Sequence, residues 1–131
     1  MATGLSDAVQ RFVAAHVTSI ELLEVLLLLR QNEGREWRAA EVAREIGSSL
    51  MSIRDRLANL AARRFVAVRE VDDDTLYRYA ADGDIRKVID DLAKAYKERR
   101  LAVVDLIYAR PLPSDIETFS DAFRIRKKDG D

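Results

Sequence analysis

The chain has 131 residues, of which 34% are charged and 48% are hydrophobic, and its formal net charge is −1. This length suits one domain with an added helical arm or tail, and the near-neutral charge argues against indiscriminate binding to nucleic acid or anionic lipid. The absence of cysteine excludes disulfides, cysteine-ligated zinc, iron–sulfur clusters and thiol nucleophiles.

Nothing in the hydropathy pattern predicts a membrane segment. The longest apolar run, Val25–Leu29, is far shorter than the roughly 20 apolar residues that cross a bilayer. The first residues also lack the basic region and apolar core of an export signal. We therefore expect a cytoplasmic protein with no membrane partner.

Two helices are predicted at the start of the chain. Apolar residues between Leu5 and Val17 recur with helical spacing, which predicts an amphipathic helix over residues 6–17. Thr18-Ser-Ile-Glu21 matches a capping box, so a second helix is expected from there to about Gln31. Its apolar residues cover almost the whole circumference, which predicts a central core helix.

The next block has the order of a helix-turn-helix. Asn32-Glu-Gly34 is a helix stop in which Gly34 is expected as the left-handed cap, and Trp37 is expected in a short extended stretch packed on the core. Residues 39–46 predict a short helix, and Gly47-Ser-Ser49 predicts the turn, because glycine tolerates positive φ and either serine can cap the next helix. That helix is expected from about 50 to 64.

A β-hairpin is predicted after these helices. Residues 65–71 and 76–80 are rich in β-branched and aromatic side chains, which favour strands. The acidic residues Asp72, Asp73 and Asp74 form the connecting turn. Two short strands are marginal alone, so they must pack on the helices.

The C-terminal part is predicted to be helical. A stripe of apolar residues from Ile85 to Leu106, interrupted only at Arg99, predicts one long helix over about 84–109. Pro111 and Pro113 end it. Residues 114–117 match a second capping box, and an amphipathic helix with Ile116, Phe119 and Phe123 follows, beside a basic cluster at 124–128.

These elements predict a mainly α protein with a small β-hairpin: a winged helix-turn-helix with flanking N- and C-terminal helices. Residues 1–109 form this domain, including the long C-terminal helix, and residues 110–131 form a tail. Helices that flank such a domain commonly build a dimer, although the C-terminal helix could instead fold back over its own core. The candidate dimerisation residues are Phe12, Tyr96, Leu101, Val103, Val104 and Ile107.

One stripe of the helix at 50–64 suits base recognition. At about 100° per residue, Ser52, Arg56, Asn59 and Arg63 lie within about 60° of one another and away from the apolar face. Arg can donate two hydrogen bonds to guanine and Asn can pair with adenine. The alternative is that any amphipathic helix carries polar residues outward. The candidate DNA-binding residues are Arg38, Arg44, Ser49, Ser52, Arg54, Arg56, Asn59 and Arg63, with Arg38, Arg44 and Arg54 near phosphates.

Three strings carry a resemblance to a known class of proteins: Glu41-Val-Ala-Arg-Glu-Ile-Gly47, Ile53-Arg-Asp-Arg-Leu-Ala-Asn-Leu-Ala-Ala-Arg-Arg-Phe-Val66 and Tyr77-Arg-Tyr79. Together they resemble bacterial winged-helix transcriptional regulators of the MarR/PadR/ArsR type. The resemblance implies a dimer that binds double-stranded DNA, with Ser49, Ser52, Arg56, Asn59 and Arg63 on the recognition helix.

The sequence departs from that pattern at two places. The glycine usual after the recognition helix is replaced by Arg64-Phe65, and the wing carries three aspartates in place of basic or glycine-rich residues. Residues 38–64 hold six arginines against three acids, whereas residues 65–82 hold two arginines against five acids. Carboxylates near a phosphate backbone are repelled, so any DNA contact should centre on the helices.

Two hypotheses about function remain. The leading one is a dimeric, winged-helix DNA-binding regulator of transcription. The alternative is a winged-helix protein-interaction module, such as an adaptor of a kinase or transcription factor, that does not bind DNA directly. The acidic turn is consistent with such a module, because it would avoid DNA, but it is also explained as a solvated loop. Phe119 and Phe123 are candidate partner-binding residues.

No catalytic or cofactor site is predicted. His16 is the only histidine and lies on an apolar helix face, so no metal site can be completed. The sequence shows no nucleophile–base pair and no glycine-rich phosphate-binding loop. We expect a protein that is not an enzyme and needs no cofactor.

Overall fold

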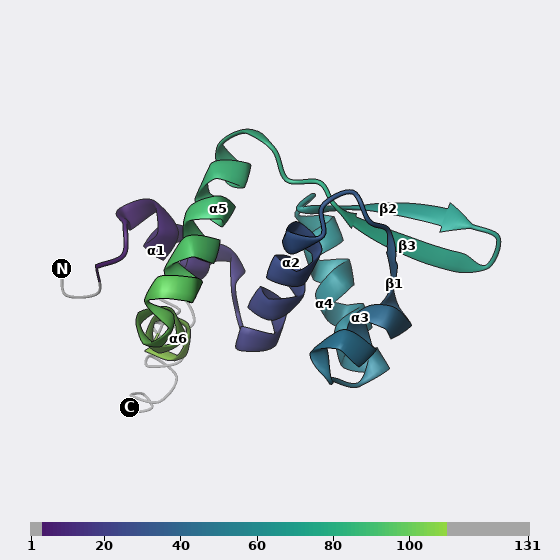
Figure 1. Ribbon diagram of the computed structural model, residues 1–131, viewed down its shortest axis with the longest axis horizontal. Helices are drawn as coiled ribbons and strands as arrows, with labels where there is room; N and C mark the ends of the chain where they lie inside the picture. Colours follow the sequence, from purple (N-terminus) through teal and green to yellow (C-terminus); the bar gives the residue numbers. More distant parts are fainter. Residues whose placement is uncertain (1–3, 110–131) are drawn as a thin grey trace, which may run out of the picture.

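The computed structural model describes residues 4–109, and Figure 1 shows the arrangement of its helices and strands. The elements in chain order are α1 (Asp7–His16), α2 (Ile20–Gln31), β1 (Trp37–Arg38), α3 (Ala39–Ile46), α4 (Leu50–Ala62), β2 (Val66–Val71), β3 (Asp74–Tyr79), α5 (Gly83–Glu98) and α6 (Arg100–Ala109). The tail helix predicted with Phe119 and Phe123 lies outside the described residues.

Serine side chains cap the first two helices. Ser6 Oγ accepts a hydrogen bond of 3.1 Å from the Val9 amide, and Ser19 Oγ accepts one of 3.0 Å from the Leu22 amide. The capping box predicted between Thr18 and Glu21 is therefore wrong, because the helix begins one residue later. This shift leaves the Glu21 carboxylate available for a tertiary contact.

Helix α2 is the central core helix, as predicted. Leu23, Val25 and Leu29 are fully buried, and α2 contacts α3, α4 and β3. Figure 1 shows α2 between two groups of elements: α3, α4 and the strands on one side, and α1, α5 and α6 on the other.

The helix-turn-helix forms where the sequence predicts it. Helix α3 ends at Gly47, which adopts φ 84° and lets the chain turn sharply into α4. Ser49 caps α4 through a hydrogen bond of 3.1 Å from the Ser52 amide. At the other end, Arg64 takes φ 66°, the left-handed position that glycine usually fills after a helix.

The predicted hairpin is part of a three-stranded antiparallel sheet with the order β1-β3-β2. The extended stretch at Trp37 pairs with Tyr77, which adds the third strand and buries the indole to 2% exposure. Val71 pairs with Asp74, so only Asp72 and Asp73 form the turn. The hairpin extends away from the helices (Figure 1).

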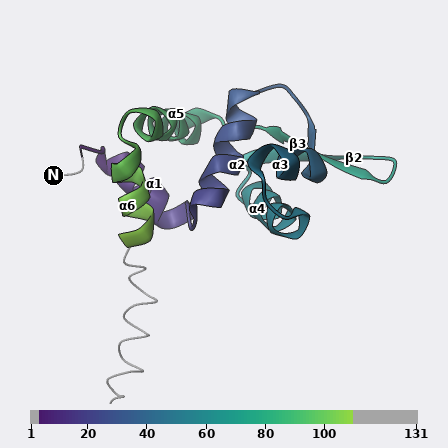
Figure 2. The same cartoon turned by 60° about the horizontal axis from the view of Figure 1, so that its bottom comes forward.

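The single helix predicted over 84–109 is wrong, because the chain breaks at Arg99 into α5 and α6. Arg99 has φ −135° and ψ 54°, outside the helical region. The break turns α6 onto α1, so that Val103 and Ile107 become buried. Figure 2 shows α6 beside α1 and crossing the end of α5.

The described residues contain no single helix that is long and apolar enough to cross a membrane. Helices α1 and α2 pass that test only as a pair, and they are bent by 112° at their junction.

Candidate nucleic-acid interface

Helix α4 presents two different polar surfaces. Its solvent-facing side carries Met51, Arg54, Asp55 and Ala58, and Met51 is 77% exposed. Its other polar side is the predicted stripe of Ser52, Arg56, Asn59 and Arg63, all of which are half-buried. The structure thus brings the four stripe residues together, as predicted, but on the flank that faces α1 and α2.

Glu21 at the start of α2 holds the first half of this stripe. Its Oε1 accepts a hydrogen bond of 2.8 Å from Arg56 Nε and a second one from the Ser52 hydroxyl. Hydrogen bonds from Ser48 and Ser52, with a further contribution from Arg56, lower the pKa of Glu21 and keep it ionised. The Arg56 guanidinium, predicted to read guanine, is therefore engaged by a carboxylate of its own chain.

His16 at the end of α1 binds Arg63, the last residue of the stripe. Arg63 Nε donates a hydrogen bond of 3.1 Å to His16 Nδ1, and the imidazole packs against Phe12 and Phe65. Burial and the nearby Arg63 charge lower the pKa of His16, so the ring stays neutral and accepts this bond. Asn59 Oδ1 is buried and has no hydrogen-bond partner among the described residues.

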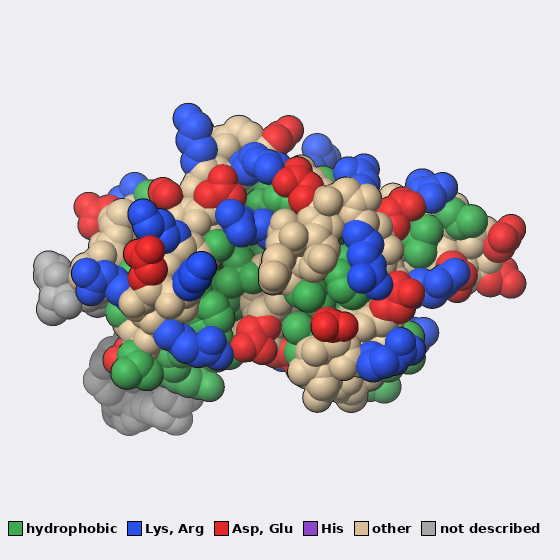
Figure 3. Space-filling view, in the orientation of Figure 1, with side chains coloured by type: hydrophobic (Ala, Val, Ile, Leu, Met, Phe, Trp, Pro, Cys, Tyr) green, Lys and Arg blue, Asp and Glu red, His purple; other side chains and the backbone are tan. Residues whose placement is uncertain are grey.

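Arg38, a predicted phosphate contact, is paired with the wing. Its Nε donates to Asp74 Oδ2 at 3.0 Å, and its Nη1 lies 3.8 Å from Glu41. The pairing raises the pKa of Arg38 and offsets one of the three aspartate charges. Asp72 and Asp73 stay exposed at the hairpin tip, and Figure 3 shows acidic side chains at this end of the molecule.

Among the described residues, Arg44, Arg54 and Arg64 are the arginines of the 38–64 block that are engaged neither by an ion pair nor by the hydrogen bond between Arg63 and His16. All three side chains are exposed. Arg44 lies in the last turn of α3, Arg54 lies on the solvent-facing side of α4, and Arg64 follows α4. Three of the six arginines of this block are thus exposed and free to contact an anionic partner.

A groove of about 530 Å³ runs between the start of α3, the solvent-facing side of α4 and the hairpin. Arg38 and Arg54 line it together with Asp55, Asp73 and Asp74. The groove between α4 and the hairpin therefore carries both positive and negative side chains. Ser49, the remaining predicted contact, is exposed at the N-terminus of α4 beside this groove.

The predicted dimerisation residues divide into two groups. Phe12, Tyr96, Val103 and Ile107 are buried by their own chain, with exposed fractions between 0% and 9%. This favours the intramolecular alternative for these four side chains. Leu101 is 76% exposed and Val104 is partly exposed, so these two remain accessible on α6.

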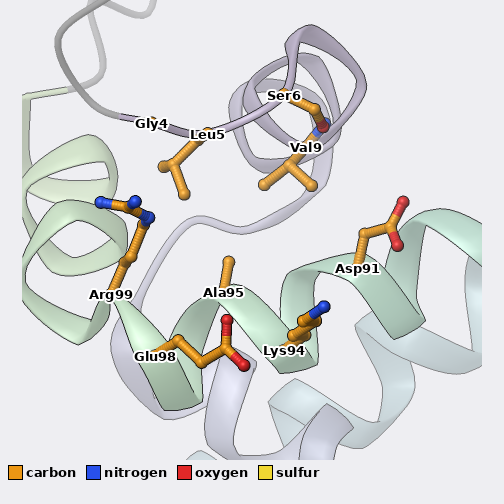
Figure 4. A pocket seen from close by; sticks show the side chains of 9 residues that line it. All are labelled: Gly4, Leu5, Ser6, Val9, Asp91, Lys94, Ala95, Glu98 and Arg99. Carbon is orange, nitrogen blue, oxygen red and sulfur yellow. The ribbon is translucent and has the colours of Figure 1, made fainter.

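A smaller hollow of about 200 Å³ lies between α1 and α5 (Figure 4). Leu5, Val9 and Ala95 give it apolar walls, and its charged neighbours Asp91, Lys94, Glu98 and Arg99 cancel in sign. Figure 4 shows the Arg99 side chain directed toward Gly4. Nothing about this hollow selects a ligand, and the described residues hold no cluster of three or more potential metal ligands.

No protein-family model matches the chain, and the comparison with curated proteins found no match. Several solved structures are similar to it, including the following three. NolR from Sinorhizobium fredii has a TM-score of 0.53 and 19% identity, covering 67% of this chain and 84% of that one. BpsR from Bordetella bronchiseptica, a protein whose DNA binding is regulated by 6-hydroxynicotinic acid, has a TM-score of 0.55 and 15% identity, covering 87% and 83%.

The third is a possible transcriptional regulator from Methanosarcina mazei Go1, with a TM-score of 0.50 and 13% identity over 69% of this chain and 78% of that one. At these identities the likeness is one of fold. The chain therefore has the winged-helix fold of transcriptional regulators, as the element order predicted.

Proposed function

We propose that this protein is a dimeric transcriptional regulator that binds double-stranded DNA through the solvent-facing side of α4. One observation carries the proposal: Arg54 lies unpaired on that side, in a helix-turn-helix whose second helix is the one that enters the major groove in proteins of this architecture. Arg44 at the end of α3 would add a phosphate contact.

The half-buried stripe would have a positioning role. Base contacts by Ser52, Arg56, Asn59 and Arg63 stay a prediction. The bonds of Ser52 and Arg56 to Glu21, and of Arg63 to His16, support a different use. They tie α4 to α1 and α2 and so fix the angle at which the solvent-facing side is presented.

The wing would contribute little to DNA affinity. Asp72 and Asp73 would lie near phosphates in a winged-helix complex, where they would weaken binding. The Arg38–Asp74 pair would hold the hairpin against the start of α3. Contact would therefore centre on α3 and α4.

The dimer would place two α4 helices about 34 Å apart, which matches one turn of B-DNA. Its interface would lie in the half of the molecule formed by α1, α5 and α6, at the opposite end from the hairpin (Figure 1). In this proposal the protein is a cytoplasmic bacterial regulator of the MarR/PadR/ArsR type. Light scattering at several concentrations would measure its oligomeric state.

Selection of bound duplexes from a random library, followed by titration over a range of salt concentrations, tests the proposal. Arg54→Ala should weaken binding and lower the slope of log K against log salt by about one phosphate contact. Lys94→Ala on α5 removes the same charge at an exposed site distant from α4, and it is the matched control once light scattering shows that it keeps the wild-type oligomeric state.

An equal loss of duplex affinity in Arg54→Ala and Lys94→Ala would show that α4 does not face the DNA. If no duplex is selected and one protein co-purifies at fixed stoichiometry, the protein-interaction module is the correct alternative. The mixed charge of the groove beside the acidic wing is the observation that favours that alternative.

A further inference from the structure

An apolar stripe runs along the outer side of α6. Leu101 and Tyr108 are each 76% exposed, and Val104 between them is partly exposed. Their spacing of i, i+3 and i+7 puts them within about 60° of one another on the helix. The opposite side of α6 is buried through Val103 and Ile107, so α6 has apolar residues on both sides. Figure 3 shows hydrophobic side chains gathered at α6.

The chain that follows α6 repeats the same pattern. Ile116, Phe119 and Phe123 have the same i, i+3 and i+7 spacing as the three exposed residues of α6. Helix α6 is described as far as Ala109, the sequence places Pro111 and Pro113 directly after it, where neither can continue a helix, and the capping box begins at Ser114. The four residues between them, 110–113, match the 2–5 residues that usually join two antiparallel helices.

We propose that residues 114–124 form a helix that packs antiparallel on the outer side of α6 in the same chain. The four-residue connection sets the register. Tyr108 meets Ile116, Val104 meets Phe119, and Leu101 meets Phe123. This pairing uses every large apolar residue of both stripes.

The short connection favours the chain's own segment over a second copy as the occupant. A four-residue link keeps the two helices adjacent and makes their association intramolecular, whereas a second copy must be recruited from solution. The inference does not depend on DNA binding. The dimer proposed above would then form on the outer surface of this helical half and not on the bare α6 stripe.

The absence of cysteine allows a direct test in the 131-residue chain. The variant Leu101→Cys/Phe123→Cys places two thiols at positions that the register brings together. The control Leu101→Cys/Ile116→Cys has a shorter separation in sequence, but in the hairpin its thiols are offset by about two helical turns, or roughly 10 Å. A disulfide requires Cα atoms within about 7 Å.

Both variants are equilibrated in a glutathione redox buffer and analysed by intact mass and non-reducing electrophoresis. The hairpin predicts that the 101–123 disulfide forms within one chain at least about tenfold more readily than the 101–116 disulfide. An undocked tail predicts the reverse order by roughly twofold, because the shorter loop closes at a lower entropic cost. Adding Tyr108→Glu should reduce the preference for 101–123.

Two results would overturn the inference. Covalent dimers that persist on dilution would show that the α6 stripe is covered by a second copy. A 101–116 disulfide that forms as readily as the 101–123 disulfide would show that the tail does not dock on α6. Because Leu101 is exposed, its replacement leaves the core intact, and circular dichroism on each variant verifies the fold.

Discussion

Arg56 Nε on α4 donates a hydrogen bond of 2.8 Å to Glu21 Oε1 on α2, although the two residues are 35 positions apart. The side chains are 32% and 23% exposed, so water screens the ion pair only in part. The Ser52 hydroxyl shares the same oxygen. Glu21 thus fixes α4 relative to the central helix, and this relationship separates residues that hold the recognition helix from residues that can contact a partner.

The first prediction compares Arg56→Ala with Arg54→Ala, two residues apart on α4. Arg56→Ala should lower the free energy of unfolding by about 1 kcal/mol, because Glu21 loses a charged hydrogen-bond donor. Arg54→Ala should change it by less than about 0.5 kcal/mol, because Arg54 is exposed and unpaired. Urea unfolding followed by circular dichroism measures both values.

Duplex binding should show the opposite order. The salt slope should fall in Arg54→Ala and stay unchanged in Arg56→Ala when both are measured where each variant is fully folded. A lower slope in Arg56→Ala, with unchanged stability, would restore the base-reading role that the sequence predicts for Arg56.

A second prediction concerns pH. The pKa of His16 is lowered in the folded state by burial and by Arg63, so the unfolded chain binds a proton at a higher pH than the folded chain does. The stability from neutral His16 is therefore present above about pH 6.5 and is lost as the pH falls through that value toward the folded pKa.

His16→Gln should flatten the stability profile between about pH 7 and pH 5.5, because glutamine offers Arg63 an oxygen acceptor but does not titrate. Thermal unfolding at a series of pH values measures the profile, and Arg11→Gln on the exposed side of α1 is the control. If wild type and His16→Gln lose stability in parallel over this range, His16 is not the responsible group.

Local patterns in the sequence were enough to predict most of the fold. The bounds of α3, the Gly47 turn, the burial of Trp37 and the central position of α2 all follow from caps, turn residues and hydrophobic periodicity. The break at Arg99 did not follow, because the apolar stripe continues on both sides of it. Only the packing of α6 on α1 requires the helix to end there. The third strand was missed because β1 has only two residues.

The candidate site was harder to predict, for a geometric reason. A helical wheel separates the buried face of α4 from the rest, but it does not tell which flank a neighbouring helix covers. The Ser52 stripe lies about a third of a turn from the centre of the buried face, whereas Asp55 lies nearly opposite to it. The presence of α2 on one flank depends on tertiary packing. Glu21 was missed because its spacing from Thr18 also fits a helix cap.

The third prediction tests the wing. Asp72→Asn/Asp73→Asn removes two carboxylates from the hairpin tip, and asparagine tolerates the positive φ of 54° at residue 72. Duplex affinity at low salt should rise by roughly fivefold if the tip lies near phosphate, because each charge contributes about 0.5 kcal/mol of repulsion at about 8 Å in water.

Asp91→Asn/Asp105→Asn makes the same change in net charge on α5 and α6, far from the hairpin. Provided that light scattering shows the wild-type oligomeric state, this variant should leave the duplex affinity within about twofold of wild type. An equal rise in both variants would mean that net charge alone is responsible. No rise in either would place the wing away from the DNA.

The fourth prediction concerns Arg64, which ends α4 in a left-handed conformation with φ 66°. The Phe65 amide bonds Leu60 O at 3.0 Å and the Arg64 amide bonds Ala61 O at 2.9 Å, the two bonds of a Schellman motif in which glycine is the favoured residue. A residue with a Cβ has a steric cost of about 1–2 kcal/mol in this conformation, and glycine removes that cost. Part of the gain is lost again, because glycine has more conformational freedom in the unfolded chain. Arg64→Gly should therefore raise the free energy of unfolding by about 0.5–1 kcal/mol, whereas Arg64→Ala, which also removes the guanidinium but keeps Cβ, should not.

Urea unfolding of the two variants separates backbone strain from the lost charge, and equal stability of both would show that residue 64 is not strained.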